Sequence, residues 1–107
     1  MNISLIIRMH PENGERLSLA LRFINTALEQ GHTVRQCFFQ GEGVLTALEL
    51  GSVGAWQHIA DSAGAELLLC SQAVEKHAVD ACAPFKIGGL GALIEAAVRS
   101  DRVVSFV

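Results

Sequence analysis

Cysteines offer the most reactive chemistry in this sequence. The 107 residues include three of them, Cys37, Cys70 and Cys82, and no CxxC pair. An odd count at these wide spacings fits neither a disulfide framework nor a structural zinc site. In a reducing compartment all three stay thiols, so the chemistry they can perform is nucleophilic or redox chemistry at sulfur.

Cys70 is the strongest candidate for the reactive thiol. It follows the apolar run ELLL and precedes the more polar SQAVEK, which can begin a helix. If the apolar run is a parallel strand, Cys70 lies at its carboxyl end, where α/β sheets gather ligands and reactive groups. The free N–H groups of a helix that starts there stabilise a thiolate. The alternative is that Cys70 is only the last buried residue of its strand.

Three other residues near Cys70 have an open role. Lys76 and His77 follow one to two helical turns later and could add positive charge, and His77 could assist thiolate formation near neutral pH. His77 is equally an ordinary histidine of an exposed turn. Cys82 lies in DACAPF, which reads as a loop because proline disfavours helix at the residue before it. It is either a resolving thiol for Cys70 or a half-buried loop residue.

The remaining motifs point away from metals and cofactors. Cys37 precedes two phenylalanines in a predicted strand and is expected in the core. The four histidines include no i, i+4 pair of the kind that binds zinc on a helix. GEGVLT, residues 41–46, lacks the third glycine of a dinucleotide fingerprint, and GGLG, residues 88–91, lacks the Lys-Ser/Thr of a P-loop. We expect no metal and no cofactor, and we interpret GEGVLT as a turn that lines the cysteine pocket.

Composition limits the classes of partner. Half of the chain is apolar, 18% is charged and the mean hydropathy is +0.37, which predicts exposed apolar surface and association with other chains. The net charge is −3 and the basic residues are scattered, so direct nucleic-acid binding is not expected. The apolar run near the N-terminus is too short for a signal sequence or a membrane span. The cytoplasm is therefore the expected location.

The hydrophobic pattern predicts alternating strands and helices. Strands are expected at residues 3–9, 33–39, 66–70 and 102–107. Helical periodicity covers residues 17–28, ending at Gly31, and residues 56–63, ending at Gly64, with Pro11 and Asn13 as boundary residues before the first helix.

Two further helices complete the pattern. A short one is expected at residues 44–50, closed by Gly51. In the last, an apolar face combines Leu90, Leu93, Ile94, Ala97 and Val98. Strands that are apolar on both sides, separated by helices, predict a single α/β domain over residues 1–107. The expected architecture is a three-layer sandwich with a mostly parallel sheet of four to five strands, like flavodoxin.

Four segments resemble the DsrE/TusD family of sulfur-relay proteins. ELLLCSQAVEKHAVD is similar to the family segment that carries the sulfur-bearing cysteine, and CFFQGEGVLTA to its aromatic strand end and glycine loop. AWQHIAD resembles the following helix, and GGLGALIEAAVRSDRVVSF the C-terminal helix and strand. The loop RMHPENGER and the short stretch LGSVGAW depart from the family pattern, and the chain is shorter than usual.

The resemblance implies a function as well as a fold. Cys70 would be a sulfurtransferase thiol that accepts persulfide sulfur from a TusA-like donor and passes it to a DsrC- or TusE-like acceptor. The implied partners are sister subunits, DsrF/TusC-like and DsrH/TusB-like, in a hetero-oligomer, with no direct nucleic acid and no membrane. Thio-modification of tRNA and oxidation of stored sulfur both remain open as the outcome. The alternatives are a non-catalytic sister subunit and a homo-oligomeric binding protein.

Overall fold

The computed structural model describes residues 1–12 and 14–107, so Asn13, predicted as a helix boundary, lies outside the described residues. Five strands form one parallel sheet in the order β4-β3-β2-β1-β5. The strands are β1 Asn2–Ile7, β2 Thr33–Phe39, β3 Glu66–Cys70, β4 Phe85–Gly88 and β5 Arg102–Phe106. The helices are α1 Gly14–Glu29, the 3-10 helix η1 Gly41–Leu48, α2 Leu50–Ala63, α3 Ser71–His77 and α4 Leu90–Arg99.

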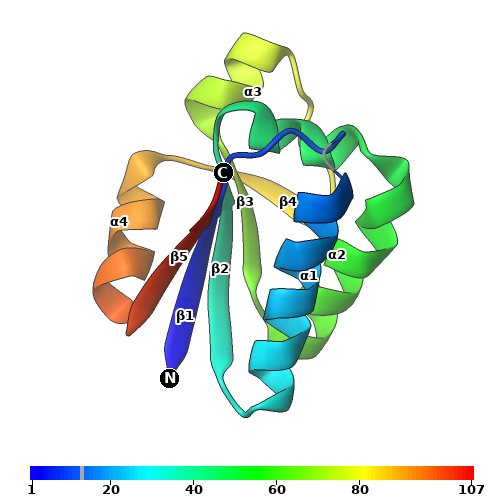
Figure 1. Ribbon diagram of the computed structural model, residues 1–107. Helices are drawn as coiled ribbons and strands as arrows, with labels where there is room; N and C mark the ends of the chain where they lie inside the picture. Colours follow the sequence, from blue (N-terminus) through cyan, green and yellow to red (C-terminus); the bar gives the residue numbers. More distant parts are fainter. Residues whose placement is uncertain (13) are drawn as a thin grey trace.

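The sheet is covered on both faces, which confirms the predicted α/β sandwich. Helices α1 and α2 lie on one face and α4 on the other, while α3 projects beyond the carboxyl ends of the strands (Figure 1). The chain moves outward from β1 to β4 and then crosses to the opposite edge through α4. Within the described residues, no helix is long and apolar enough to cross a bilayer.

Most element boundaries match the sequence pattern. β2 and β3 have the predicted bounds, and α1 and α2 are followed by Gly31 and Gly64 at positive φ, the left-handed conformation that ends a helix. The short strand β4 is absent from the predicted elements. It has only four residues, of which Lys86 and Ile87 are exposed, so it shows neither an apolar run nor an alternation.

The helix expected at residues 44–50 is wrong in its bounds. The structure has the 3-10 helix η1 at Gly41–Leu48, and Gly51 lies inside α2 instead of closing a helix. The reason is a close approach between η1 and the end of β1. A Cβ on Gly43 would overlap the backbone carbonyl oxygen of Ile7, so only glycine lets η1 pack this tightly across the strand ends.

The face of the sheet under α1 and α2 holds the aromatic core. Phe39 contacts Trp56 at 5.2 Å between ring centroids and Phe85 at 5.5 Å, both edge to face. Trp56 and Phe39 are fully buried. These rings join β2, β4 and α2, which are far apart in the sequence, into one packed layer.

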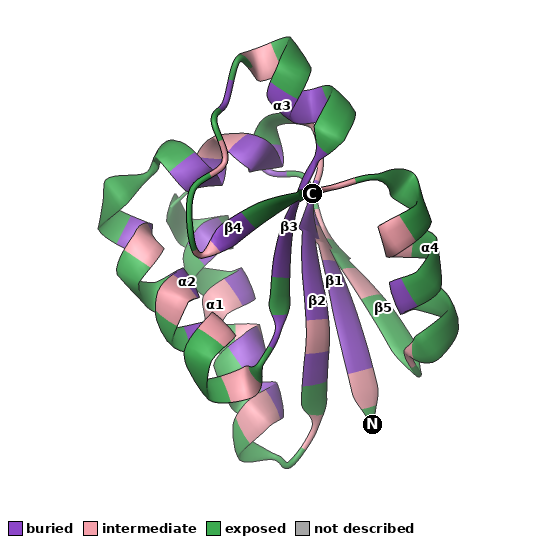
Figure 2. Cartoon of the chain, turned by 180° about the vertical axis from the view of Figure 1, so that it is seen from behind, coloured by how far each residue is buried: buried purple, intermediate pink, exposed green. Residues whose placement is uncertain are grey.

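Helix α4 forms where predicted, and most of its predicted apolar face points away from the sheet. Its buried residue is Ala96, and Ala92 and Leu93 pack partly against the core. The larger apolar side chains Leu90, Ile94 and Val98 are 52%, 63% and 80% exposed. Alanines of α4 pack against the core, whereas its larger apolar side chains are exposed. Figure 2 shows that most of the α4 ribbon belongs to exposed residues.

Candidate functional site at the carboxyl edge of the sheet

Cys70 is the last residue of β3 and the residue from which α3 begins. Its backbone is extended, with φ −58° and ψ 125°, and α3 runs from Ser71 to His77 directly after it. This confirms the predicted strand end and helix start around the cysteine. The Cys70 side chain makes no capping hydrogen bond to α3, and the residue is 8% exposed. Cys70 is therefore a buried residue at the end of its strand.

The neighbour of Cys70 on β4 is Gly88, which has no side chain to cover the thiol. The two residues are paired across the parallel ladder. A Cβ on Gly88 would come within 2.9 Å of the Leu68 Cδ1, so a larger residue here would require the Leu68 side chain to shift. On the other side, η1 packs against both β3 and α3, so the GEGVLT segment lies beside the cysteine element.

The three thiols occupy three different environments. All are free cysteines: Cys37 is fully buried, Cys70 is buried at the end of its strand and Cys82 is exposed. Burial raises the pKa of the Cys37 thiol to about 12, which keeps it protonated and confirms its prediction as a core residue. Cys82 lies in the segment between α3 and β4, where its carbonyl oxygen accepts a hydrogen bond from the Phe85 N–H. Its role as a resolving thiol stays a prediction.

Lys76 and His77 lie in the last turn of α3, at the opposite end from Cys70. Seven residues of α-helix rise about 10 Å, so the two side chains start about that far along the axis from the thiol. Positive charge in the last turn is favourable for the helix itself, because it compensates the negative end of the helix dipole. Assistance to Cys70 by His77 remains a prediction.

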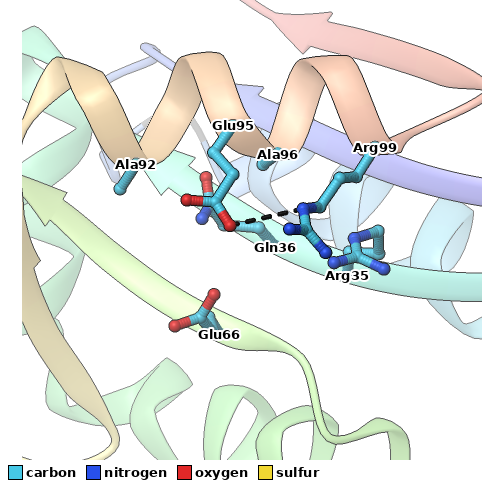
Figure 3. A pocket seen from close by; sticks show the side chains of 7 residues that line it. All are labelled: Arg35, Gln36, Glu66, Ala92, Glu95, Ala96 and Arg99. Carbon is cyan, nitrogen blue, oxygen red and sulfur yellow. Dashed lines mark ion pairs between the residues drawn. The ribbon is translucent and has the colours of Figure 1, made fainter.

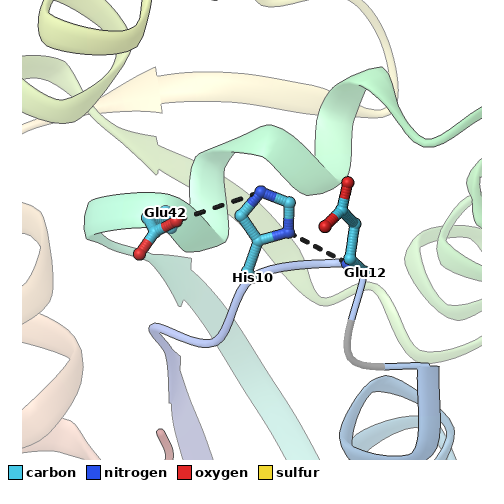
Figure 4. A network of polar contacts seen from close by, with 3 residues as sticks. All are labelled: His10, Glu12 and Glu42. Atoms are coloured by element: carbon cyan, nitrogen blue, oxygen red, sulfur yellow. Dashed lines mark hydrogen bonds and ion pairs between the residues drawn. The ribbon is translucent and has the colours of Figure 1, made fainter.

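His10 forms a polar contact at the same edge that the sequence reading missed. The Glu12 N–H donates to His10 Nδ1 at 3.0 Å, and His10 Nε2 lies 3.9 Å from Glu42 Oε2 (Figure 4). Because Nδ1 accepts a hydrogen bond, the proton of the neutral ring is on Nε2, facing Glu42. The contact ties the loop after β1 to η1. The sequence signal for this contact was that His10 and Glu42 each follow a predicted strand, and the carboxyl ends of parallel strands lie at the same edge of a sheet.

The sequence matches a known protein family over nearly its whole length. Residues 1–106 match the sequence model of the DsrE/DsrF-like family. The chain belongs to the DsrE/DsrF-like family. Among its relatives, the sulfurtransferase TusD of Cronobacter sakazakii is 33% identical, with 99% of this chain and 100% of the relative covered. The putative sulfurtransferase DsrE of Allochromatium vinosum is 28% identical, with 99% and 98% covered.

A structural comparison shows that a protein of known structure has the same fold. The crystal structure of the ychN protein from E. coli superposes with a TM-score of 0.82, covers 99% of both chains and shares 17% sequence identity. The alignments to TusD and DsrE extend over 128 positions, whereas this chain has 107 residues. This DsrE/DsrF-like chain therefore aligns with these two relatives over almost all of its residues but is shorter than the alignments.

Proposed function

We propose that this DsrE/DsrF-like protein is a sulfurtransferase subunit that carries persulfide sulfur on Cys70. The observation that carries the proposal is the position of Cys70, at the carboxyl end of β3 and directly before α3, in a chain whose relatives bear the names TusD and DsrE. Of the other two cysteines, Cys37 is sealed in the core as a neutral thiol, and Cys82 lies outside any strand or helix.

The chemistry is a thiol exchange without net oxidation. The Cys70 thiolate attacks the outer sulfur of a donor persulfide, R–S–SH. A new S–S bond forms between Cys70 and that sulfur, the donor S–S bond breaks, and R–S⁻ leaves with the electron pair. Transfer onward repeats the step, with the acceptor thiolate attacking the outer sulfur of the Cys70 persulfide and Cys70 leaving as thiolate. No electrons are gained or lost overall, and the reaction needs only thiols and protons.

Partner proteins supply the donor and acceptor thiols in this proposal. We expect a TusA-like donor, a DsrC- or TusE-like acceptor and sister subunits of the DsrF/TusC and DsrH/TusB kinds. The outward stripe of Leu90, Ile94 and Val98 on α4 supports an assembly of chains, because exposed large apolar side chains in one stripe mark an interaction surface.

The low exposure of Cys70 favours a second candidate, a non-catalytic sister subunit. An 8% exposed cysteine fits a packed scaffold residue as well as a guarded thiol. The two candidates differ in whether the thiol reacts under native conditions at neutral pH.

Mass spectrometry of the intact protein distinguishes these candidates. The protein is incubated with a small-molecule persulfide donor, and the same treatment is applied to Cys70→Ser and Cys82→Ser. We expect the native chain and Cys82→Ser to gain one sulfur atom and Cys70→Ser to gain none. Labelling that survives Cys70→Ser would move the site to another cysteine. An unlabelled native chain that still assembles with sister subunits would support the scaffold role.

A further inference from the structure

A second polar site lies under α4, away from the cysteine. A cavity of about 340 Å³ opens between α4 and the strands β2 and β3, at the size of the smaller sites that bind small molecules. Its floor includes Glu66, the first residue of β3, whereas Cys70 is the last. Four strand residues span about 13 Å, so the cavity is separate from the thiol. Figure 3 shows its side chains converging from α4, β2 and β3.

An irregularity in β2 creates this site. In the β1–β2 ladder Ile3 pairs with Val34 but Ser4 pairs with Gln36, so Arg35 is an extra residue in β2. In a regular strand, consecutive side chains point to opposite faces. The extra residue breaks that alternation, and both Arg35 and Gln36 line the cavity on the α4 side. Such bulges are found where a strand must redirect a side chain.

Gln36 places an unsatisfied hydrogen-bond acceptor at the cavity. The residue is 3% exposed, and its Oε1 finds no donor among the residues that the structure describes. The Arg35 Nε is likewise buried without an acceptor among those residues. Buried polar atoms are nearly always paired, so one acceptor and one cationic donor facing the same cavity call for a molecule that offers both an N–H and an anionic oxygen.

The charges around the cavity are balanced. Arg35 and Arg99 provide two cations, and Glu66 and Glu95 provide two anions. Arg99 Nε lies 3.3 Å from Glu95 Oε1, and both side chains are mostly exposed at the mouth. A simple anion would lie beside two carboxylates, and a simple cation beside two guanidinium groups. A ligand that carries one charge of each sign, with no net charge, matches both pairs.

We propose that this cavity binds a small zwitterion of the α-amino-acid class. The ligand carboxylate accepts hydrogen bonds from Arg35 Nε and from the Arg99 guanidinium, as guanidinium and carboxylate groups do. The ligand ammonium donates to Gln36 Oε1 and faces Glu66. A short side chain lies against Ala92 and Ala96 of α4, which also line the cavity. This binding function is independent of persulfide chemistry at Cys70.

The test compares a zwitterion with its two halves. L-alanine is the probe, propionate lacks its ammonium and ethylamine lacks its carboxylate. Each is titrated into the isotopically labelled protein at neutral pH, and the side-chain amide of Gln36 and the Nε–H of Arg35 are followed by NMR. We expect saturable shifts of both signals with L-alanine, and binding about tenfold weaker or more with either half, since each charged hydrogen bond lost lowers the affinity by at least that factor.

Matched variants separate the site from the fold. Gln36→Leu keeps the shape and removes the amide, and Arg35→Met removes the guanidinium. Arg22→Met on α1, outside the cavity, is the control. We expect the first two to weaken L-alanine binding about tenfold or more and the control to leave it unchanged. Far-UV circular dichroism verifies the fold, and sulfur loading at Cys70 should be equal in all of the variants.

Three results would overturn the zwitterion site. One is the absence of saturable L-alanine binding by a folded native chain. Another is equal affinity for L-alanine, propionate and ethylamine, which would indicate weak charge attraction only. The third is a change in oligomeric mass caused by Gln36→Leu in a protein that does not bind L-alanine. That result would assign the cavity to a contact between subunits. None of these results bears on sulfur loading at Cys70, so the two proposals fail separately.

Discussion

On the face covered by α1 and α2 three aromatic rings of the core meet, whereas the face covered by α4 buries polar side chains beside apolar ones. Trp56, Phe38, Phe39 and Phe85 are among the buried residues of the chain, and three of these rings meet on the α2 side. The α4 side holds Gln36, and Ser4 hydrogen-bonded to Ser100 at 2.7 Å. Phe38 is two residues from Gln36 in β2 and therefore lies on the same face. The first face is an aromatic core, and the second combines apolar packing with buried polar groups.

The largest expected effect is on the α2 side. Trp56→Ala removes a fully buried ring and its contact with Phe39, and we expect it to lower the free energy of unfolding by about 3–5 kcal/mol. Val98→Ala on α4, where the side chain is 80% exposed, should change it by less than about 0.5 kcal/mol. Urea denaturation measures both. Similar losses for the two variants would mean that Trp56 and Val98 do not differ in burial as described.

A second pair of variants tests the tight packing of η1. Gly43→Ala places a methyl group against the Ile7 carbonyl, and we expect it to cost about 1–3 kcal/mol of unfolding free energy. Gly54→Ala, inside α2 with open space around it, should stabilise the protein by about 0.5–1 kcal/mol. Thermal unfolding should show a lower melting temperature for Gly43→Ala and a higher one for Gly54→Ala. A stable Gly43→Ala variant would contradict the close approach.

The buried thiol of Cys37 makes the free energy of unfolding depend on pH. Its pKa is raised from 9.0 to about 12 by burial, so above pH 9 the unfolded chain loses this proton while the folded chain keeps it. Stability from this group is therefore complete below pH 9 and falls by about 1.4 kcal/mol for each pH unit above it. Urea unfolding from pH 8 upward measures the slope. Cys37→Ala should flatten it by that amount, and Cys82→Ala, at an exposed position, should not.

The smallest effect on stability is expected on α4, together with a clear effect on assembly. Ile94→Lys replaces a side chain that is 63% exposed, so the unfolding free energy of the single chain should change by less than about 0.5 kcal/mol. We expect association with other chains to weaken about tenfold or more, because a charge would enter a desolvated apolar contact. Analytical ultracentrifugation measures association. Leu19→Lys, at an exposed leucine of α1, is the control. Unchanged association of Ile94→Lys would remove α4 from the interface.

The sequence predicted the elements better than the directions in which they face. Long apolar runs and helical periods were sufficient for β2, β3 and α4, because burial of an apolar strand or stripe leaves a strong pattern. The apolar stripe of α4 was predicted, but periodicity shows only that a helix has an apolar face, not what covers it. Cys70 at a strand end was predictable from a single run of leucines. The cavity at Arg35 and Gln36 was not, because an extra strand residue shifts the alternation and leaves no mark in the composition.

That extra residue in β2 has a genetic consequence. Deleting the codon for Arg35 would shorten the chain by one residue and bring β1 and β2 into an unbroken ladder, with Ile3 to Ile7 opposite consecutive partners. The shortened protein should still fold, because the aromatic contacts of Phe39 lie at the other end of β2 from the deleted residue. It would lack one wall of the cavity, so the bulge is a feature that a single in-frame event can add to or erase from this fold.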